Sequence, residues 1–182
     1  MKKLAVLIAT WFGSGLIPPP KFMHGIAGTY GSFFALPLCL LFVWLPTLPF
    51  WLYQDTVVAY IYLVIIITAL GLWSVQRAEW ALGPRTDWKG KTKFRDQNQI
   101  VIDEVLGMLV TCAPLILALQ VQNWRLAYLI AFLLFRFFGI VKVPPTKKWD
   151  RRQDAIGVMM DDVVAGVYAA ILLTITVLIF KI

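Results

Sequence analysis

The sequence contains a single histidine, His24, and only two cysteines, Cys39 and Cys112. Both cysteines lie in apolar runs, where a cysteine usually behaves as a small hydrophobic residue, and their spacing fits no metal-binding pattern. His24 falls in an expected loop and lacks the flanking motifs of phosphatases that work through a phosphohistidine. The scarcity of these residues gives no support to a cysteine–histidine metal centre and disfavours covalent histidine catalysis.

Charged residues are also scarce. They make up 15% of the 182 residues, against 60% that are hydrophobic, and the mean hydropathy is +0.76. A soluble domain is closer to half apolar, and its apolar residues are dispersed along the chain. Here they gather in runs that approach the roughly 20 residues needed to cross a bilayer. We therefore expect an integral membrane protein with a single domain, residues 1–182.

Five apolar segments are candidate membrane spans: residues 31–51, 56–75, 100–120, 125–142 and 157–180. Residues 4–17 form a shorter apolar stretch, which is more typical of an interfacial or re-entrant helix than of a span. Pro37, Pro46 and Pro49 are expected to kink or end the first span. The predicted fold is all-α, a polytopic bundle of about five transmembrane helices plus a short N-terminal helix.

The net charge of +7 could indicate nucleic-acid binding, but the basic residues lie in loops between apolar runs. With the N-terminus in the cytoplasm, 14 basic residues fall in cytoplasmic regions, whereas only Arg125 and Lys181 fall outside. This asymmetry follows the positive-inside rule. The predicted partner is therefore the membrane, and no nucleic acid is expected.

Two pairs of adjacent acids interrupt the apolar runs: Asp103 and Glu104 in the third span, and Asp161 and Asp162 in the fifth. Both spans run from the cytoplasm outward in the predicted topology. All four carboxylates should therefore lie at cytoplasmic ends, in the layer of the lipid headgroups.

Basic residues and a glycine-rich segment are predicted to reach the same layer. The fourth span runs in the opposite direction, so its C-terminal part brings Arg136 and Lys142 to the cytoplasmic face. The segment GTYGS, residues 28–32, is expected to form a turn that opens the first span on that face. Acids, bases and a candidate anion-binding turn therefore converge.

Such a cluster suits the hydrolysis of a phosphate ester. Charged side chains inside a bilayer are kept inward, paired or bound to a ligand, and four facing carboxylates would repel one another without a cation. Mg²⁺ takes oxygen ligands, commonly bridges to phosphate, and lowers the pKa of a bound water. We therefore expect the four acids to be catalytic residues and Mg²⁺ ligands.

The remaining phosphate charge could be held by Arg136, Lys142, and Lys147 or Arg151. Backbone N–H groups at a helix N-terminus can also receive an anion, which makes the segment with Thr29, Gly31 and Ser32 a further candidate phosphate site.

Small residues follow each acid pair. Gly107 comes three residues after Glu104, and Gly166 comes four residues after Asp162. Small residues let membrane helices approach closely. The third and fifth spans are therefore predicted to pack against each other near the acids.

Other interpretations remain open. The helix macrodipole favours acids near a helix N-terminus without any metal, and the glycines could serve turns or packing alone. Intramembrane acids could also form the path of a cation or proton transporter, although no acid lies deep in the outer half of the third or fifth span. A non-catalytic membrane scaffold is the third class.

Five segments resemble, in order, the landmarks of the phosphatidylglycerophosphatase A family. They are FGSGL at 12–16, GTYGS at 28–32, IDEVLGM at 102–108, FRFFGIVKVPPTKKWDRR at 135–152 and GVMMDDVVAG at 157–166. The family patterns are FGSG, PGTxGS, DExxGM, FRxxDxxKPxP with a following FDR, and GIMxDDxxAG. The resemblance covers about residues 10–170.

The resemblance implies a multi-pass enzyme of the bacterial inner membrane that uses Mg²⁺ to hydrolyse phosphatidylglycerophosphate, with its active site at the cytoplasmic face. By matched position it assigns roles to both acid pairs, to Arg136 and Lys142, and to the turn at Thr29. The sequence departs from the pattern at Gly139, where the family has an aspartate. It also departs at Val143, which replaces a proline, and at Ala27. Another lipid phosphate as substrate, or a loss of activity, would be consistent with these departures.

Overall fold

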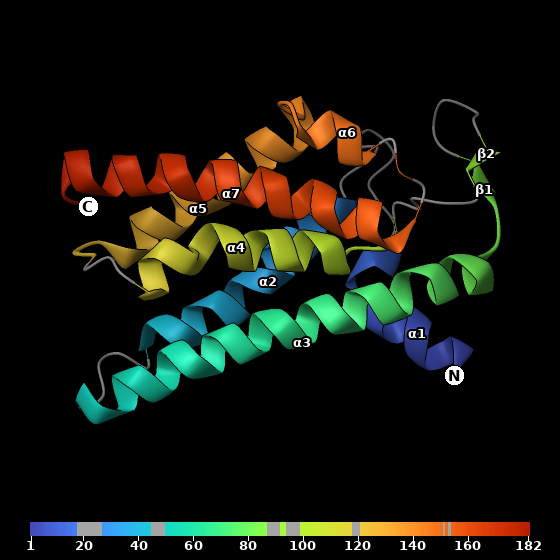
Figure 1. The fold of residues 1–182 in the computed structure, drawn as a ribbon, viewed down its shortest axis with the longest axis horizontal. Helices are drawn as coiled ribbons and strands as arrows, with labels where there is room; N and C mark the ends of the chain where they lie inside the picture. Colours follow the sequence, from blue (N-terminus) through green and yellow to red (C-terminus); the bar gives the residue numbers. More distant parts are fainter. Residues whose placement is uncertain are drawn as a thin grey trace.

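The computed structural model describes residues 1–17, 27–44, 50–86, 92–93, 99–117, 121–150, 152 and 154–182. The chain is a bundle of helices (Figure 1). They are α1 Lys2–Ala9, the 3₁₀ helix η1 Ser14–Leu16, α2 Ala27–Trp44, α3 Phe50–Leu82, α4 Ile102–Leu117, α5 Trp124–Val141, α6 Thr146–Asp150 and α7 Ala155–Phe180. Two short strands, β1 Arg85–Thr86 and β2 Thr92–Lys93, pair antiparallel. The predicted all-α class is confirmed.

The long helices alternate in direction. Helices α2, α4 and α7 run one way along the bundle, and α3 and α5 run the other (Figure 1). Helix α4 lies at the centre and contacts α2, α3, α5 and α7. After its acidic first turn the helix is almost entirely apolar, and residues as large as Leu106, Met108 and Leu109 are buried. A helix that is apolar all round belongs inside a bundle.

Three helical segments in the described part of the chain are long and apolar enough to cross a bilayer: Asp55–Leu82, Trp124–Val141 and Ala155–Phe180. These identify the chain as a membrane protein. Helix α4 has 16 residues, about 24 Å at 1.5 Å per residue, which is less than the ~30 Å hydrocarbon core. The apolar part of α2, Ala27–Phe42, is also shorter than a standard span. The predicted count of five spans is therefore not confirmed.

Most predicted spans correspond to observed helices. Helices α5 and α7 begin and end within two residues of the predicted limits, whereas α3 is longer at both ends. Helix α2 begins at Ala27 and continues through Pro37. The prediction for Pro46 and Pro49 falls outside the described residues.

The N-terminal stretch is a short docked helix. Helix α1 has eight residues, too few to cross a bilayer, and it packs against α3. At its end the Ala9 carbonyl accepts a 2.9 Å hydrogen bond from the Val101 N–H, just before α4. A turn at residues 10–13 and then η1 follow. This segment therefore joins the end of the bundle at which α4 and α7 begin (Figure 1).

Candidate functional site

The first acid pair lies in the opening turn of the central helix. Asp103 and Glu104 are the second and third residues of α4, and Asp103 is buried. The Asp103 carboxylate accepts the Glu104 N–H at 2.9 Å. This N–H belongs to the first helical turn, where backbone donors have no partner within the helix, so acids are favoured there.

Glu104 joins three helices. Its Oε2 lies 2.5 Å from Nη1 of Arg136 on α5 and 2.8 Å from Oγ of Ser32 on α2. The Arg136 Nη1 also donates to Ser32 Oγ at 3.3 Å. A side chain on residue 28 would collide with this group, because a Cβ there would lie 2.0 Å from Glu104 Oε1. Gly28 therefore allows α2 to approach the carboxylate.

The Nε–H group of Arg136 is an unsatisfied hydrogen-bond donor in the described part of the chain. Its Nε is buried and has no hydrogen-bond acceptor among the described residues. A buried donor without an acceptor costs about 1–3 kcal/mol. The side chains of Arg136 and Glu104 are only 16% and 15% exposed, which makes their ion pair less screened than a surface pair.

The second acid pair meets the second cation. Lys142 Nζ lies 2.7 Å from Asp161 Oδ2. Lys142 is the C-cap of α5, and its φ of 48° places it in the left-handed region, which is uncommon for a residue other than glycine. Its N–H donates to the Phe138 carbonyl and closes the helix. The strained cap turns the chain so that Lys142 faces α7.

Tyr168 holds the same cap from the other side. Its hydroxyl donates to the Pro144 carbonyl at 2.7 Å, and its ring stacks on Phe138 with centroids 5.6 Å apart. Tyr168 follows Asp161 by seven residues, so both lie on the same face of α7. Sequence reasoning missed this residue, although the seven-residue spacing from the acid was a usable signal.

The macrodipole does not account for Asp161 and Asp162. They are the seventh and eighth residues of α7, beyond the first turn to which the dipole effect is confined. The N-cap is instead Asp154, whose Oδ1 accepts the Gly157 N–H at 2.8 Å. Hydrogen bonds from Arg152 and from the Gly157 N–H hold the pKa of Asp154 below its ordinary value. The helix macrodipole can therefore explain the position of the first acid pair but not that of the second.

Glycines bring the two acid-bearing helices together, as predicted. A Cβ on Gly166 would lie 2.5 Å from the Gly107 carbonyl oxygen, and one on Gly107 would lie 2.8 Å from the Asp162 carbonyl oxygen. Asp162 is also within electrostatic range of Asp103, Glu104 and Arg136. Both acid pairs and both cations therefore gather toward the end of the bundle at which α4 and α7 begin and α5 ends; Figure 1 shows these three helix ends together.

The structure places the other predicted phosphate-binding residues as follows. Residues 28–32 are helical, so the prediction of a turn there is wrong. Gly28 and Ser32 lie one helical turn apart at the Glu104 carboxylate, and Gly31 packs on Val101 beside them. Thr29 lies in the first turn of α2 as it is described. The side chain of Lys147, within α6, and the whole of Arg151 lie outside the described residues.

The expected Mg²⁺ site stays a prediction. Among the described residues, no three acidic, histidine or cysteine side chains are placed to hold one metal ion. Glu104 is ion-paired with Arg136, and Asp161 is ion-paired with Lys142. The arrangement is thus not a four-carboxylate cage. Its oxygen donors do fit Mg²⁺ bound through one or two carboxylates and completed by substrate phosphate.

Gly139, the main departure from the expected pattern, lies on α5 one turn after Phe135. A Cβ at this position would meet no atom within 4 Å. The backbone therefore has room for a larger side chain, and no close approach of another helix requires glycine here.

Comparisons with known proteins agree with the motifs. A sequence model of phosphatidylglycerophosphatase A matches residues 7–177. Proteins with that name from Escherichia coli and Haemophilus influenzae are each 30% identical, with coverage of 90% and 94% of this chain and 78% and 90% of their own lengths. A Bacteroides thetaiotaomicron protein, provisionally named a phosphatidylinositol-3-phosphatase, is 34% identical over 94% of this chain and 92% of its own length. No solved structure matches.

Proposed function

The chain belongs to the phosphatidylglycerophosphatase A family, and from this premise we propose that it hydrolyses phosphatidylglycerophosphate to phosphatidylglycerol and inorganic phosphate. The site is the end of the bundle where α4 and α7 begin and α5 ends. The family and the names of its members support the phosphatase activity. The roles of individual residues are our assignment.

The observation that carries the assignment is the state of Arg136. The guanidinium is oriented by Glu104 and Ser32, and 16% of the Arg136 side chain remains exposed. A phosphate oxygen that reaches the exposed part of the guanidinium would form a charge-assisted hydrogen bond with it. An arginine fixed before the substrate arrives also needs little reordering on binding.

Lys142 and the acids complete the proposed mechanism. The ammonium group of Lys142, shared with Asp161, supplies a second positive charge for the phosphate. Asp162 and Asp103 are the acids that we assign to orienting the attacking water and accepting its proton, because each lies one helical turn from the glycine at which α4 and α7 approach most closely. Mg²⁺, when bound by these carboxylates, would neutralise phosphoryl oxygens and acidify the water.

The proposed location is the bacterial inner membrane with the site facing the cytoplasm. The described basic residues Lys2, Lys3, Lys142 and Lys148 belong to elements at the end of the bundle that holds the acid pairs (Figure 1). Arg125 and Lys181 lie at the opposite end. Cytoplasmic ends of membrane helices carry the excess of basic residues.

A second substrate is favoured by one comparison. The relative provisionally named a phosphatidylinositol-3-phosphatase is 34% identical over nearly the whole chain. Both lipids present a phosphate monoester on a headgroup at the membrane surface, so the same cluster could act on either one.

The test is phosphate release by the purified protein in mixed micelles. Phosphatidylglycerophosphate, phosphatidylinositol 3-phosphate and phosphatidic acid are compared with Mg²⁺ and with EDTA, and a Gly139→Asp variant is run in parallel. We expect Mg²⁺-dependent release, fastest from phosphatidylglycerophosphate. Faster release from the inositol lipid would make that lipid the substrate. Full activity in EDTA would exclude a requirement for a metal ion. Activity confined to the Gly139→Asp variant would identify the natural site as inactive.

A further inference from the structure

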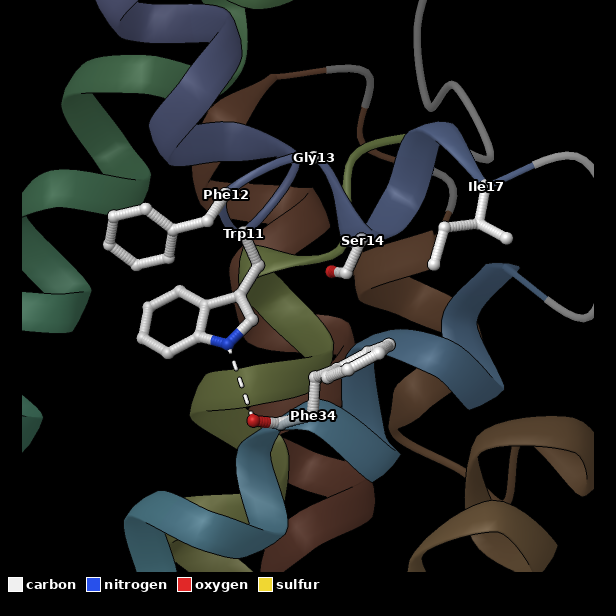
Figure 2. Close-up of a pocket in the computed structure, with 6 residues that line it drawn as sticks. All are labelled: Trp11, Phe12, Gly13, Ser14, Ile17 and Phe34. Atoms are coloured by element: carbon white, nitrogen blue, oxygen red, sulfur yellow. Dashed lines mark hydrogen bonds between the residues drawn. The ribbon is translucent and has the colours of Figure 1, made fainter.

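A cavity of about 380 Å³ lies beside the turn that follows α1. It is lined by Trp11, Phe12, Gly13, Ser14, Ile17 and Phe34, and we call it the N-terminal groove (Figure 2). Its volume falls within the range of about 300–1,000 Å³ that is usual for small-ligand sites. The groove plays no part in the mechanism proposed above.

The groove is built by an unusual backbone. Trp11, Phe12 and Gly13 all have positive φ, at 47°, 55° and 89°. Two non-glycine residues in succession in the left-handed region are strained and persist only where other contacts hold them. Buried Thr10 supplies such contacts, since its Oγ1 accepts the Gly13 N–H and its carbonyl accepts the Ser14 hydroxyl.

The lining is suited to hydrocarbon. None of the described residues that form the groove is charged. Its two polar side chains already donate hydrogen bonds. The Trp11 indole N–H donates to the Phe34 carbonyl (Figure 2), and the Ser14 hydroxyl donates to the Thr10 carbonyl. Phe12 is 70% exposed and Phe34 is 42% exposed. A polar ligand would find no free hydrogen-bond donor on these side chains, whereas an alkyl chain would gain contact with aromatic and aliphatic surface.

The groove and the phosphate cluster lie close to the same few residues at the start of α4. Val101, which precedes α4, packs against Gly15 of η1 on one side and Gly31 of α2 on the other. Gly31 also faces Glu104, and Phe34 lies only two residues beyond Ser32 on α2. At 1.5 Å per residue, Phe34 lies about 3 Å beyond Ser32 along α2 but projects from roughly the opposite face, so the groove and the cluster lie at one level on either side of α2.

We propose that the N-terminal groove binds an acyl chain of the lipid substrate while the headgroup phosphate is held by Arg136 and Lys142. This inference rests on the proposed function. A phosphatase acting at a membrane must distinguish its lipid from the surrounding lipids, and a groove at the level of the phosphate site gives the enzyme a second point of contact. The polar cluster binds the phosphate, and the groove holds the chain in register with it.

Kinetics with matched tryptophan variants test the proposal. Ile17→Trp fills the groove, and Leu16→Trp is the control, because Leu16 is a similarly exposed neighbour outside the lining. With long-chain phosphatidylglycerophosphate we expect Ile17→Trp to raise KM at least fivefold and Leu16→Trp to leave it unchanged. With the dihexanoyl substrate neither variant should differ from the wild type. Equal effects of the two variants, or equal effects on the two substrates, would overturn the proposal.

Photolabelling separates this proposal from the proposed function, because it needs no turnover. Phosphatidylglycerol with a diazirine on its acyl chain should label residues 11–17 and Phe34, and unlabelled phosphatidylglycerophosphate should compete better than phosphatidylethanolamine. Equal competition by the two lipids would mean ordinary membrane lipid and contradict the proposal. A change of oligomeric state in Ile17→Trp would point to a second copy of the chain in the groove and also contradict it.

Discussion

Arg136 and Lys142 each meet one acid from a different pair, Glu104 on α4 and Asp161 on α7. The sequence motifs named all four residues, but they did not reveal which acid pairs with which base. Pairing depends on how α5 is rotated between α4 and α7, and single-helix patterns do not contain that angle. Gly28 was missed for the same reason, because its role is to make room for a carboxylate 76 residues later in the chain.

Tyr168 is a positioning residue, and Tyr168→Phe tests this role. The variant keeps the stacking on Phe138 but loses the hydrogen bond to the Pro144 carbonyl, which holds the cap that directs Lys142. A net hydrogen bond contributes about 1 kcal/mol, so phosphate release at low substrate should fall about fivefold. We expect the loss to appear mainly in KM, because Lys142 is assigned to phosphate binding.

The matched control for Tyr168 is Tyr128→Phe. Tyr128 donates to the Cys39 carbonyl from the buried interior of the bundle. This variant should lower the thermal unfolding temperature without changing KM. If the two variants lower activity equally, Tyr168 serves general stability and not the position of Lys142.

Helix boundaries were predicted best where the apolar run begins next to a polar N-cap residue. Helix α5 follows its N-cap Asn123, and α7 follows Asp154. The segment 28–32 was misread as a turn because it contains two glycines. Gly28, Gly31 and Ser32 are spaced three and four residues apart, which places them on one helix face, and this face packs on the beginning of α4. The left-handed turn at Trp11 was not predictable, because tertiary hydrogen bonds hold it.

The crossing of α4 and α7 can be tested by alanine substitution. Gly107→Ala places a Cβ 2.5 Å from the Phe135 ring and 2.8 Å from the Asp162 carbonyl, so the helices must separate and the acids must move apart. We expect lower thermal stability and a loss of most phosphate release. Overpacking of this kind costs about 1–3 kcal/mol.

Gly139→Ala is the control for that substitution. Its Cβ meets open space, and alanine is favoured over glycine in a helix by about 0.5–1 kcal/mol. The variant should unfold at an equal or higher temperature in a detergent melt and keep its activity. If Gly107→Ala has the same unfolding temperature and the same rate of phosphate release as Gly139→Ala, close packing of α4 on α7 does not organise the site.

For the molecule as a whole, the alternation of helix directions and the gathering of charges at one end followed from the apolar runs and the positive-inside rule. The predicted number of spans is not confirmed, because hydropathy does not distinguish a lipid-facing helix from one buried inside the bundle. Helix α4 is as apolar as a span but has only 16 residues, 11 of which are buried. Its sequence reflects contact with other helices on every side.

The central claim is that acids from α4 and α7 form one catalytic site, and Asp162→Asn tests it most directly. The substitution preserves shape and removes one negative charge from a group that includes Asp103, Glu104 and Asp161. Loss of an essential acid should lower phosphate release from phosphatidylglycerophosphate by about a hundredfold or more. The removal of like-charge repulsion should leave thermal stability equal or higher.

The control is Asp154→Asn, since asparagine caps a helix as well as aspartate does and residue 154 lies outside the cluster. The decisive measurement is the rate of phosphate release by these two variants, compared at equal concentrations of folded protein. The account predicts a folded, inactive Asp162→Asn protein beside an active Asp154→Asn protein. Wild-type turnover by Asp162→Asn would contradict it.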